Sequence, residues 1–200
     1  MQLTANAEDK RASLMADCAR LFRKLGYHGT SMSDIAELVN LNKGTLYYYF
    51  PSKGDILHAI YNEAFVTLDE NIALVPAGLP PDEELTAYVK AILRAIASVP
   101  DVIAVYFQEH PWLESLLSKE QAAGIRAKEA EFTERIRTTI RNGVRANTFR
   151  RVNDELLSVQ LLSMISSLYR WHVAESAASA ELVADTIVGY LYDGILAPPR

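Results

Sequence analysis

The chain has 200 residues, half of them hydrophobic, and a formal net charge of −5 at pH 7. This hydrophobic content excludes an intrinsically disordered chain, and the length is sufficient for one or two domains with a buried core. The acidic balance excludes a protein that coats nucleic acid with its whole surface, and the single cysteine, Cys18, excludes an internal disulfide.

Helical periodicity dominates the sequence and predicts an all-α fold of about nine helices. The first helix is expected from about Glu8 to Leu25, and Gly26 follows as a stop signal. Ser31 and Asp34 have the spacing of a capping box, which predicts the start of a second helix.

A tight turn and a third short helix are expected next. Asn40 tolerates the left-handed backbone conformation that a tight turn requires. Asn42 is a good N-cap for a helix over residues 43–50. Two short helices joined by a tight turn form a helix-turn-helix, which presents polar side chains to the major groove of DNA.

The rest of the chain is expected to form a helical body. A fourth helix follows Pro51, and residues 75–81, which contain three prolines, form a linker-like stretch. Further helices are expected over residues 82–99, 102–109, 118–146, 154–174 and 179–194.

The helix-turn-helix segment contains two groups of residues at fixed spacing. They are Thr30-Ser31-x-x-Asp34-Ile35-Ala36 and Lys43-Gly44-Thr45-Leu46-Tyr47-x-x-Phe50-x-Ser52-Lys53. This pattern, within roughly residues 8–60, resembles the DNA-binding signature of the TetR family of transcriptional regulators. Asn40 stands where the family turn usually has Gly, Asn42 where the cap is usually Ser, and Tyr49 where His is frequent.

The resemblance implies a homodimeric regulator with a helix-turn-helix DNA-binding domain over residues 1–53 and an effector-binding and dimerisation domain over residues 54–200. It implies a repressor that binds a palindromic operator in double-stranded DNA. A small, largely apolar effector would release it, and the segment around Tyr169-Arg170-Trp171 is similar to regulators that sense acyl-coenzyme A. The alternatives are an activator of the same fold and a helical interaction protein without DNA specificity.

Ten residues are expected to contact DNA. Lys43 and Thr45, near the start of the third helix, can reach base edges or phosphate, and Gly44 lets the helix approach closely. Tyr47 resembles a family tyrosine that bonds phosphate, and Lys53 places an ammonium at a helix N-terminus. The full set is Thr30, Ser31, Asn42, Lys43, Gly44, Thr45, Tyr47, Tyr48, Tyr49 and Lys53.

The body is expected to hold an effector pocket and a dimer interface. The candidate pocket residues are Tyr88, Ile92, Tyr106, Phe107, Trp112, Leu116, Phe132, Tyr169, Arg170 and Trp171, although a stripe of aromatics is more often core than a cavity. The last two helices are nearly apolar, which favours a four-helix dimer interface, with intrachain core as the alternative. The interface residues are Leu157, Leu161, Met164, Ile165, Leu168, Val183, Ile187, Tyr190 and Leu191.

Arg137, Arg141 and Arg145 recur at the spacing of one helix face. One interpretation is a solvated face that pairs with acidic neighbours. The other is a site that captures the phosphate or carboxylate of an amphipathic ligand. The residues alone leave both open.

Patterns of catalysis and metal binding are absent from the sequence. Its four histidines, His28, His58, His110 and His172, have no ligand spacing, and there is no Gly-rich phosphate loop or nucleophile elbow. No apolar run approaches the roughly 20 residues of a membrane span, and residues 1–9 lack the features of a signal peptide. We therefore expect a non-enzymatic, cytoplasmic protein with no cofactor, metal or membrane partner.

Overall fold

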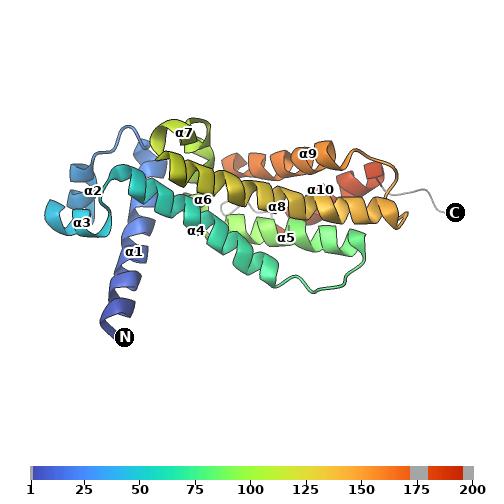
Figure 1. The fold of residues 1–200 in the computed structure, drawn as a ribbon, viewed down its shortest axis with the longest axis horizontal. Helices are drawn as coiled ribbons and strands as arrows, with labels where there is room; N and C mark the ends of the chain where they lie inside the picture. The colour runs from blue at the N-terminus through green and yellow to red at the C-terminus, as the bar shows by residue number, and fades with distance from the viewer. Residues whose placement is uncertain (1, 172–179, 196–200) are drawn as a thin grey trace. The chain divides into compact units, whose positions relative to one another are not determined.

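The computed structural model describes residues 2–171 and 180–195, with side chains placed for residues 8–169 and 180–194 (Figure 1). Its regular elements are helices, which confirms the predicted all-α fold. They are α1 (Gln2–Leu25), α2 (Met32–Leu38), α3 (Lys43–Tyr49), α4 (Lys53–Ala73), α5 (Pro81–Ser98), α6 (Pro100–Glu109), α7 (Leu113–Leu116), α8 (Lys119–Arg145), α9 (Asp154–Ser167) and α10 (Ala180–Ile195), with 3-10 turns η1 (His110–Trp112) and η2 (Leu168–Trp171). The four-residue α7 was not expected from periodicity, and α9 ends before the predicted residue 174 because the chain tightens into η2.

The chain divides into two compact units, each built from separate segments of sequence. The head unit comprises residues 1–65 and 101–125, and the body unit comprises residues 66–100 and 126–200. These units are defined by packing, in which the first part of α4 contacts later segments, and the expected domain boundary at residue 53 stays a prediction. The ring centroids of Tyr61 and Tyr106 lie 4.9 Å apart, and Gln121 Nε2 donates to Asp55 Oδ1 at 3.0 Å.

The core of the head unit contains the apolar residues of the helix-turn-helix. Ile35 and Ala36 of α2 and Leu46 of α3 are buried, and so is Phe50. Further large buried side chains of this unit include Leu14, Phe22, Ile56, Leu57 and Ile60. Burial raises the pKa of the Cys18 thiol to about 12, so this cysteine is a neutral core residue.

The body unit is organised around α5, whose buried face includes Leu85, Val89 and Leu93. Helix α10 lies against α5, where the Thr86 and Tyr192 hydroxyls are 2.8 Å apart and Lys90 pairs with Asp185 at 2.8 Å.

Two of the three arginines on the arginine face of α8 pair with acidic residues. Arg137 Nε lies 2.7 Å and Arg141 Nη2 lies 2.9 Å from Asp154 Oδ2 at the start of α9. Glu134 lies 3.3 Å from the Arg141 guanidinium. These pairs match the interpretation of a solvated face beside acidic neighbours for Arg137 and Arg141, whose guanidiniums are engaged by carboxylates.

We expect Asp154→Asn to destabilise the protein at neutral pH and to lose this effect in acid. Hydrogen bonds from Arg137 and Arg141 lower the pKa of Asp154 from 3.8 to about 2. A carboxyl with a lowered folded-state pKa stabilises the fold above its unfolded pKa, and the contribution disappears as the pH falls through the folded value. Denaturant unfolding of both proteins between about pH 7 and about pH 2 measures the difference.

Glu155→Gln is the matched control, because Glu155 is more exposed and lies 3.5 Å from Arg137. We expect its effect to be smaller at every pH. A difference between wild type and Asp154→Asn that stayed constant into acid would contradict the pairing.

Candidate nucleic-acid interface and pocket

Local hydrogen bonds build the helix-turn-helix as the sequence predicted. Asp34 N–H donates to Ser31 Oγ at 3.2 Å and Ser31 N–H donates to Asp34 Oδ2 at 2.7 Å, so the capping box is present. Asn40 adopts the left-handed conformation with φ of 51°. Asn42 Oδ1 accepts the Thr45 N–H at 2.8 Å and caps α3.

Most of the expected DNA-contacting residues lie at the surface of α3 and the caps. Tyr48 is 79% exposed and Tyr47 is 47% exposed. Ser31, Asn42, Lys43 and Gly44 are exposed, while Thr45 and Tyr49 are half-buried. The Thr45 hydroxyl donates to Asn42 Oδ1 at 3.0 Å, so it is oriented by the cap. The surface of α3 therefore combines one cation, hydroxyl groups and aromatic rings that can face a duplex.

Thr30 does not have the role that the sequence predicted. Its side chain is only 2% exposed, and its hydroxyl donates to the Gly26 carbonyl at 2.9 Å. A buried hydroxyl with an internal partner cannot reach a phosphate, so this prediction is corrected. Thr30 closes the loop between α1 and α2 instead.

Gly44 has no role inside the fold that demands a glycine. A Cβ added to it would meet only the exposed Asn42 Oδ1, at 3.3 Å. A glycine within a helix costs about 0.5–1 kcal/mol relative to alanine. Since no internal contact offsets that cost, the small size of Gly44 fits a close approach from outside.

Arg11 is a candidate contact that the sequence did not single out. Its guanidinium carbon lies 4.7 Å from the centroid of the Phe50 ring, directly after α3, and the residue is exposed. Stacking on an aromatic ring orients an arginine. Only the fold brings α1 to the end of α3, so no local pattern could reveal this cation.

We expect Tyr47→Phe to weaken binding to every duplex by the same factor, about fivefold. Loss of one hydrogen bond costs about 1 kcal/mol, and a phosphate contact positions the protein without selecting a base. Fluorescence anisotropy with several unrelated duplexes measures this factor. A change of preferred sequence would contradict the phosphate role of Tyr47.

The expected pocket residues are divided between the two units. Tyr106, Phe107, Trp112 and Leu116 belong to the head unit, and Tyr88, Ile92, Phe132 and Tyr169 belong to the body unit. The Tyr106 ring packs 4.9 Å from Tyr61 and 5.0 Å from Phe107, which favours the core alternative for this group. Trp112 is exposed. The side chains of Arg170 and Trp171 lie outside the described residues.

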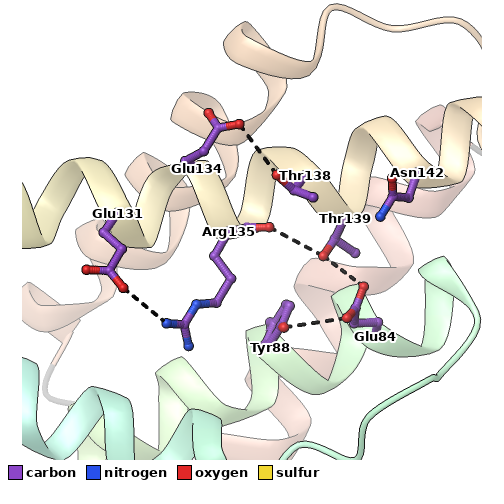
Figure 2. Close-up of a pocket in the computed structure, with 8 residues that line it drawn as sticks. All are labelled: Glu84, Tyr88, Glu131, Glu134, Arg135, Thr138, Thr139 and Asn142. Atoms are coloured by element: carbon purple, nitrogen blue, oxygen red, sulfur yellow. Dashed lines mark hydrogen bonds and ion pairs between the residues drawn. The ribbon is translucent and has the colours of Figure 1, made fainter.

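A pocket of about 400 Å³ lies between α5 and α8 of the body unit. Its lining residues are Glu84, Tyr88, Glu131, Glu134, Arg135, Thr138, Thr139 and Asn142 (Figure 2). Thr139 donates to Glu84 at 2.9 Å, and Arg135 pairs with Glu131 at 3.7 Å. Of the expected pocket residues whose side chains the structure describes, only Tyr88 lines this site. The other lining side chains are charged or hydrogen-bonding, so they differ in type from the mainly aromatic and aliphatic set expected from the sequence.

The expected dimer residues are partly buried within the body unit. Leu161, Ile165, Ile187 and Leu191 are buried within the single chain, so they offer little surface to a second copy, and their place in an interface stays a prediction. Leu157, Leu168 and Val183 are half-buried, and Met164 and Tyr190 are exposed. Large apolar side chains that are exposed on α9 and α10 are Leu156, Val159, Met164, Leu182 and Tyr190. Because large apolar residues recur on several sides of α9, the sequence could not distinguish its inward face from its outward face.

The described residues contain no group of three or more His, Cys, Asp or Glu that could hold a metal ion. Among the helices formed by these residues, none has the length and apolar character needed to cross a membrane.

Comparisons with known proteins agree with the helix-turn-helix geometry. Residues 14–60 match the tetR family of bacterial regulatory proteins, and residues 78–195 match the tetracyclin repressor-like C-terminal domain. The HTH-type transcriptional repressor KstR2 of Rhodococcus jostii is 26% identical over 200 residues, which cover 98% of this chain and 95% of the relative.

Solved structures show the same fold. PfmR, a TetR family regulator from Thermus thermophilus, has 28% identity and a TM-score of 0.83, covering 90% of this chain and 97% of its own. AibR, solved in complex with isovaleryl coenzyme A and operator DNA, has 24% identity and a TM-score of 0.81, covering 95% and 99%. Because the C-terminal match alone spans more than half of the sequence, the chain belongs to the tetR family of bacterial transcriptional regulators.

Proposed function

We propose that this protein is a transcriptional repressor that binds a palindromic operator as a homodimer and leaves it when a small effector binds. The observation that carries the proposal is the surface of α3, where Lys43, Gly44, Tyr47 and Tyr48 are exposed together on a capped helix. Such a helix fits the major groove, and exposed residues near its N-terminus reach base edges. Repression is the activity that the name of the Rhodococcus relative gives for that protein.

Dimerisation is supported by the exposed apolar face of α9 and α10. Leu156, Val159 and Met164 fall on one side of α9, and Leu182 and Tyr190 on one side of α10. Large apolar side chains that are exposed on one side of a helix mark a surface that another molecule can cover. In a two-fold dimer, two copies of α3 would lie about 34 Å apart, one turn of DNA.

The effector is proposed to bind the helical body, with acyl-coenzyme A thioesters as the first class to test. The structure of AibR was solved with isovaleryl coenzyme A and operator DNA, and its likeness to this chain is one of fold. The pocket between α5 and α8 can donate and accept hydrogen bonds but carries three carboxylates and one guanidinium. The excess negative charge of this lining disfavours the phosphate groups of coenzyme A. An acyl-coenzyme A thioester would therefore have to bind at another, apolar site in the body.

The test of function is binding to an operator duplex and to an unrelated duplex over a range of salt concentrations. A regulator should bind the operator more tightly, and log K should fall by about 0.9 per phosphate contact for each log unit of salt. Equal binding to both duplexes, or no salt dependence, would favour the helical interaction protein.

The test of the effector is release of the bound operator by acyl-coenzyme A thioesters of increasing chain length, with coenzyme A and the free acids as controls. Release by thioesters alone supports this class. Release by an unrelated small molecule, without any effect of the thioesters, rejects it.

A further inference from the structure

Lys53, the first residue of α4, has its ammonium directed into the head unit. Its Nζ donates to the backbone carbonyl oxygens of Tyr27 and Thr30, each at 2.8 Å. The same nitrogen lies 4.2 Å from the centroid of the Tyr27 ring. An ammonium has three donors, and two carbonyls and a ring face engage it on three sides. The cation that the sequence pattern assigns to DNA phosphate is therefore engaged inside the protein.

These bonds hold the loop from which the helix-turn-helix begins. Tyr27 and Thr30 lie between α1 and α2, and both are buried. Thr30 directly precedes Ser31, the N-cap of α2. Lys53 therefore joins the start of α4 to the start of α2, and a shift of this loop would change how α2 and α3 are held.

Glu109, the last residue of α6, holds the same loop from its other side. The buried Glu109 carboxylate accepts the Tyr27 N–H at 3.3 Å. The Tyr27 backbone is thus bonded to a carboxylate at its N–H and to an ammonium at its carbonyl. Burial lowers the pKa of Lys53, and the negative charge of Glu109 opposes that change. We call this arrangement the Lys53–Tyr27–Glu109 tie.

The N-terminus of α4 already has an anion beside it. The Asp55 carboxylate accepts the Ser52 hydroxyl at 2.7 Å and the Gln121 amide at 3.0 Å. A carboxylate in the first turn takes the favourable interaction with the helix dipole that a phosphate would otherwise gain. This end of α4 is therefore less suited to a phosphate than the exposed start of α3.

We propose that Lys53 supports DNA binding as a positioning residue, through the Lys53–Tyr27–Glu109 tie, and not as a phosphate ligand. The inference rests on the proposed DNA-binding function. It has a consequence for Glu109, which is buried. If Glu109 acted only through its charge, removing that negative charge would strengthen binding to the DNA polyanion. If Glu109 acts through the Lys53–Tyr27–Glu109 tie, the same change loosens the tie and weakens binding.

The experiment measures operator affinity as a function of salt concentration for wild type, Lys53→Met, Glu109→Gln and the double variant. Each affinity is calculated from the concentration of protein that is able to bind DNA, so that a partly unfolded variant is not mistaken for a weak binder. Lys43→Met, with the same charge change at an exposed site, is the matched comparison. We expect Lys53→Met to weaken binding about tenfold without changing the salt slope. Glu109→Gln, which keeps an acceptor for the Tyr27 N–H, should also weaken binding. The double variant should be no weaker than Lys53→Met alone, because both changes break one tie.

Two results would overturn the proposal. One is a salt slope lowered by about 0.9 in Lys53→Met, as loss of a phosphate contact requires. The other is stronger binding by Glu109→Gln. Failure of the proposed function gives a different result, in which the wild type binds no duplex at all. Failure of the inference alone leaves wild-type operator binding intact and changes only the behaviour of the variants.

Discussion

The Gly44→Leu variant should fold like wild type and bind the operator at least about a hundredfold more weakly, roughly 2.7 kcal/mol. A Cβ at residue 44 would meet only Asn42 Oδ1, at 3.3 Å, so the exposed α3 cap must shift by a few tenths of an ångström. Leucine is the better helix former, which offsets this adjustment. On DNA the same side chain would hold α3 away from the groove. Base contacts worth about 1–3 kcal/mol each would be lost together with phosphate contacts.

Gly124→Leu is the matched control for this prediction. Gly124 is exposed on α8, and an added Cβ would meet nothing within 4 Å. Thermal unfolding and operator binding are measured on both variants. Wild-type affinity in Gly44→Leu would mean that α3 does not approach DNA at this residue.

The double variant Val159→Glu/Tyr190→Glu should be a folded monomer with operator affinity lowered by about a thousandfold. Val159 and Tyr190 are 51% and 74% exposed, so charge at these positions leaves the protomer core unchanged. In a dimer the four added carboxylates would lie in an apolar interface, where unpaired charge is costly. A monomer would then contact one half-site only.

The control is Val66→Glu/Leu74→Glu, which makes the same change at exposed apolar residues outside α9 and α10. Sedimentation velocity gives the oligomeric state, and anisotropy gives the affinity. If both double variants remained dimers, the interface would lie elsewhere on the body unit.

The parts of the fold that depend on neighbouring residues could be predicted from the sequence. Ser31 with Asp34, Asn40 and Asn42 each act through a backbone group at most three residues away, so their spacing specifies the geometry. The burial of Ile35 and Leu46 follows from helical periodicity in the same way.

The parts that depend on distant residues could not be predicted. Lys53 is bonded to carbonyls 23 and 26 residues earlier in the chain, and Glu109 lies 82 residues from its partner Tyr27. The sequence marks Lys53 as a cation at a helix start, which predicts a phosphate contact, whereas the fold directs it inward. The same limit applies to Tyr106, whose aromatic character suggested a pocket although its ring packs against Tyr61.

The most direct test of sequence-specific DNA binding is selection of bound duplexes from a random pool with the wild-type chain. A dimeric regulator should enrich a palindrome whose half-site centres are separated by about 10–10.5 base pairs or a multiple of this spacing. Gly44→Leu, passed through the same selection, should enrich nothing. Recovery of a random pool by wild type, without any enriched sequence, would contradict the account.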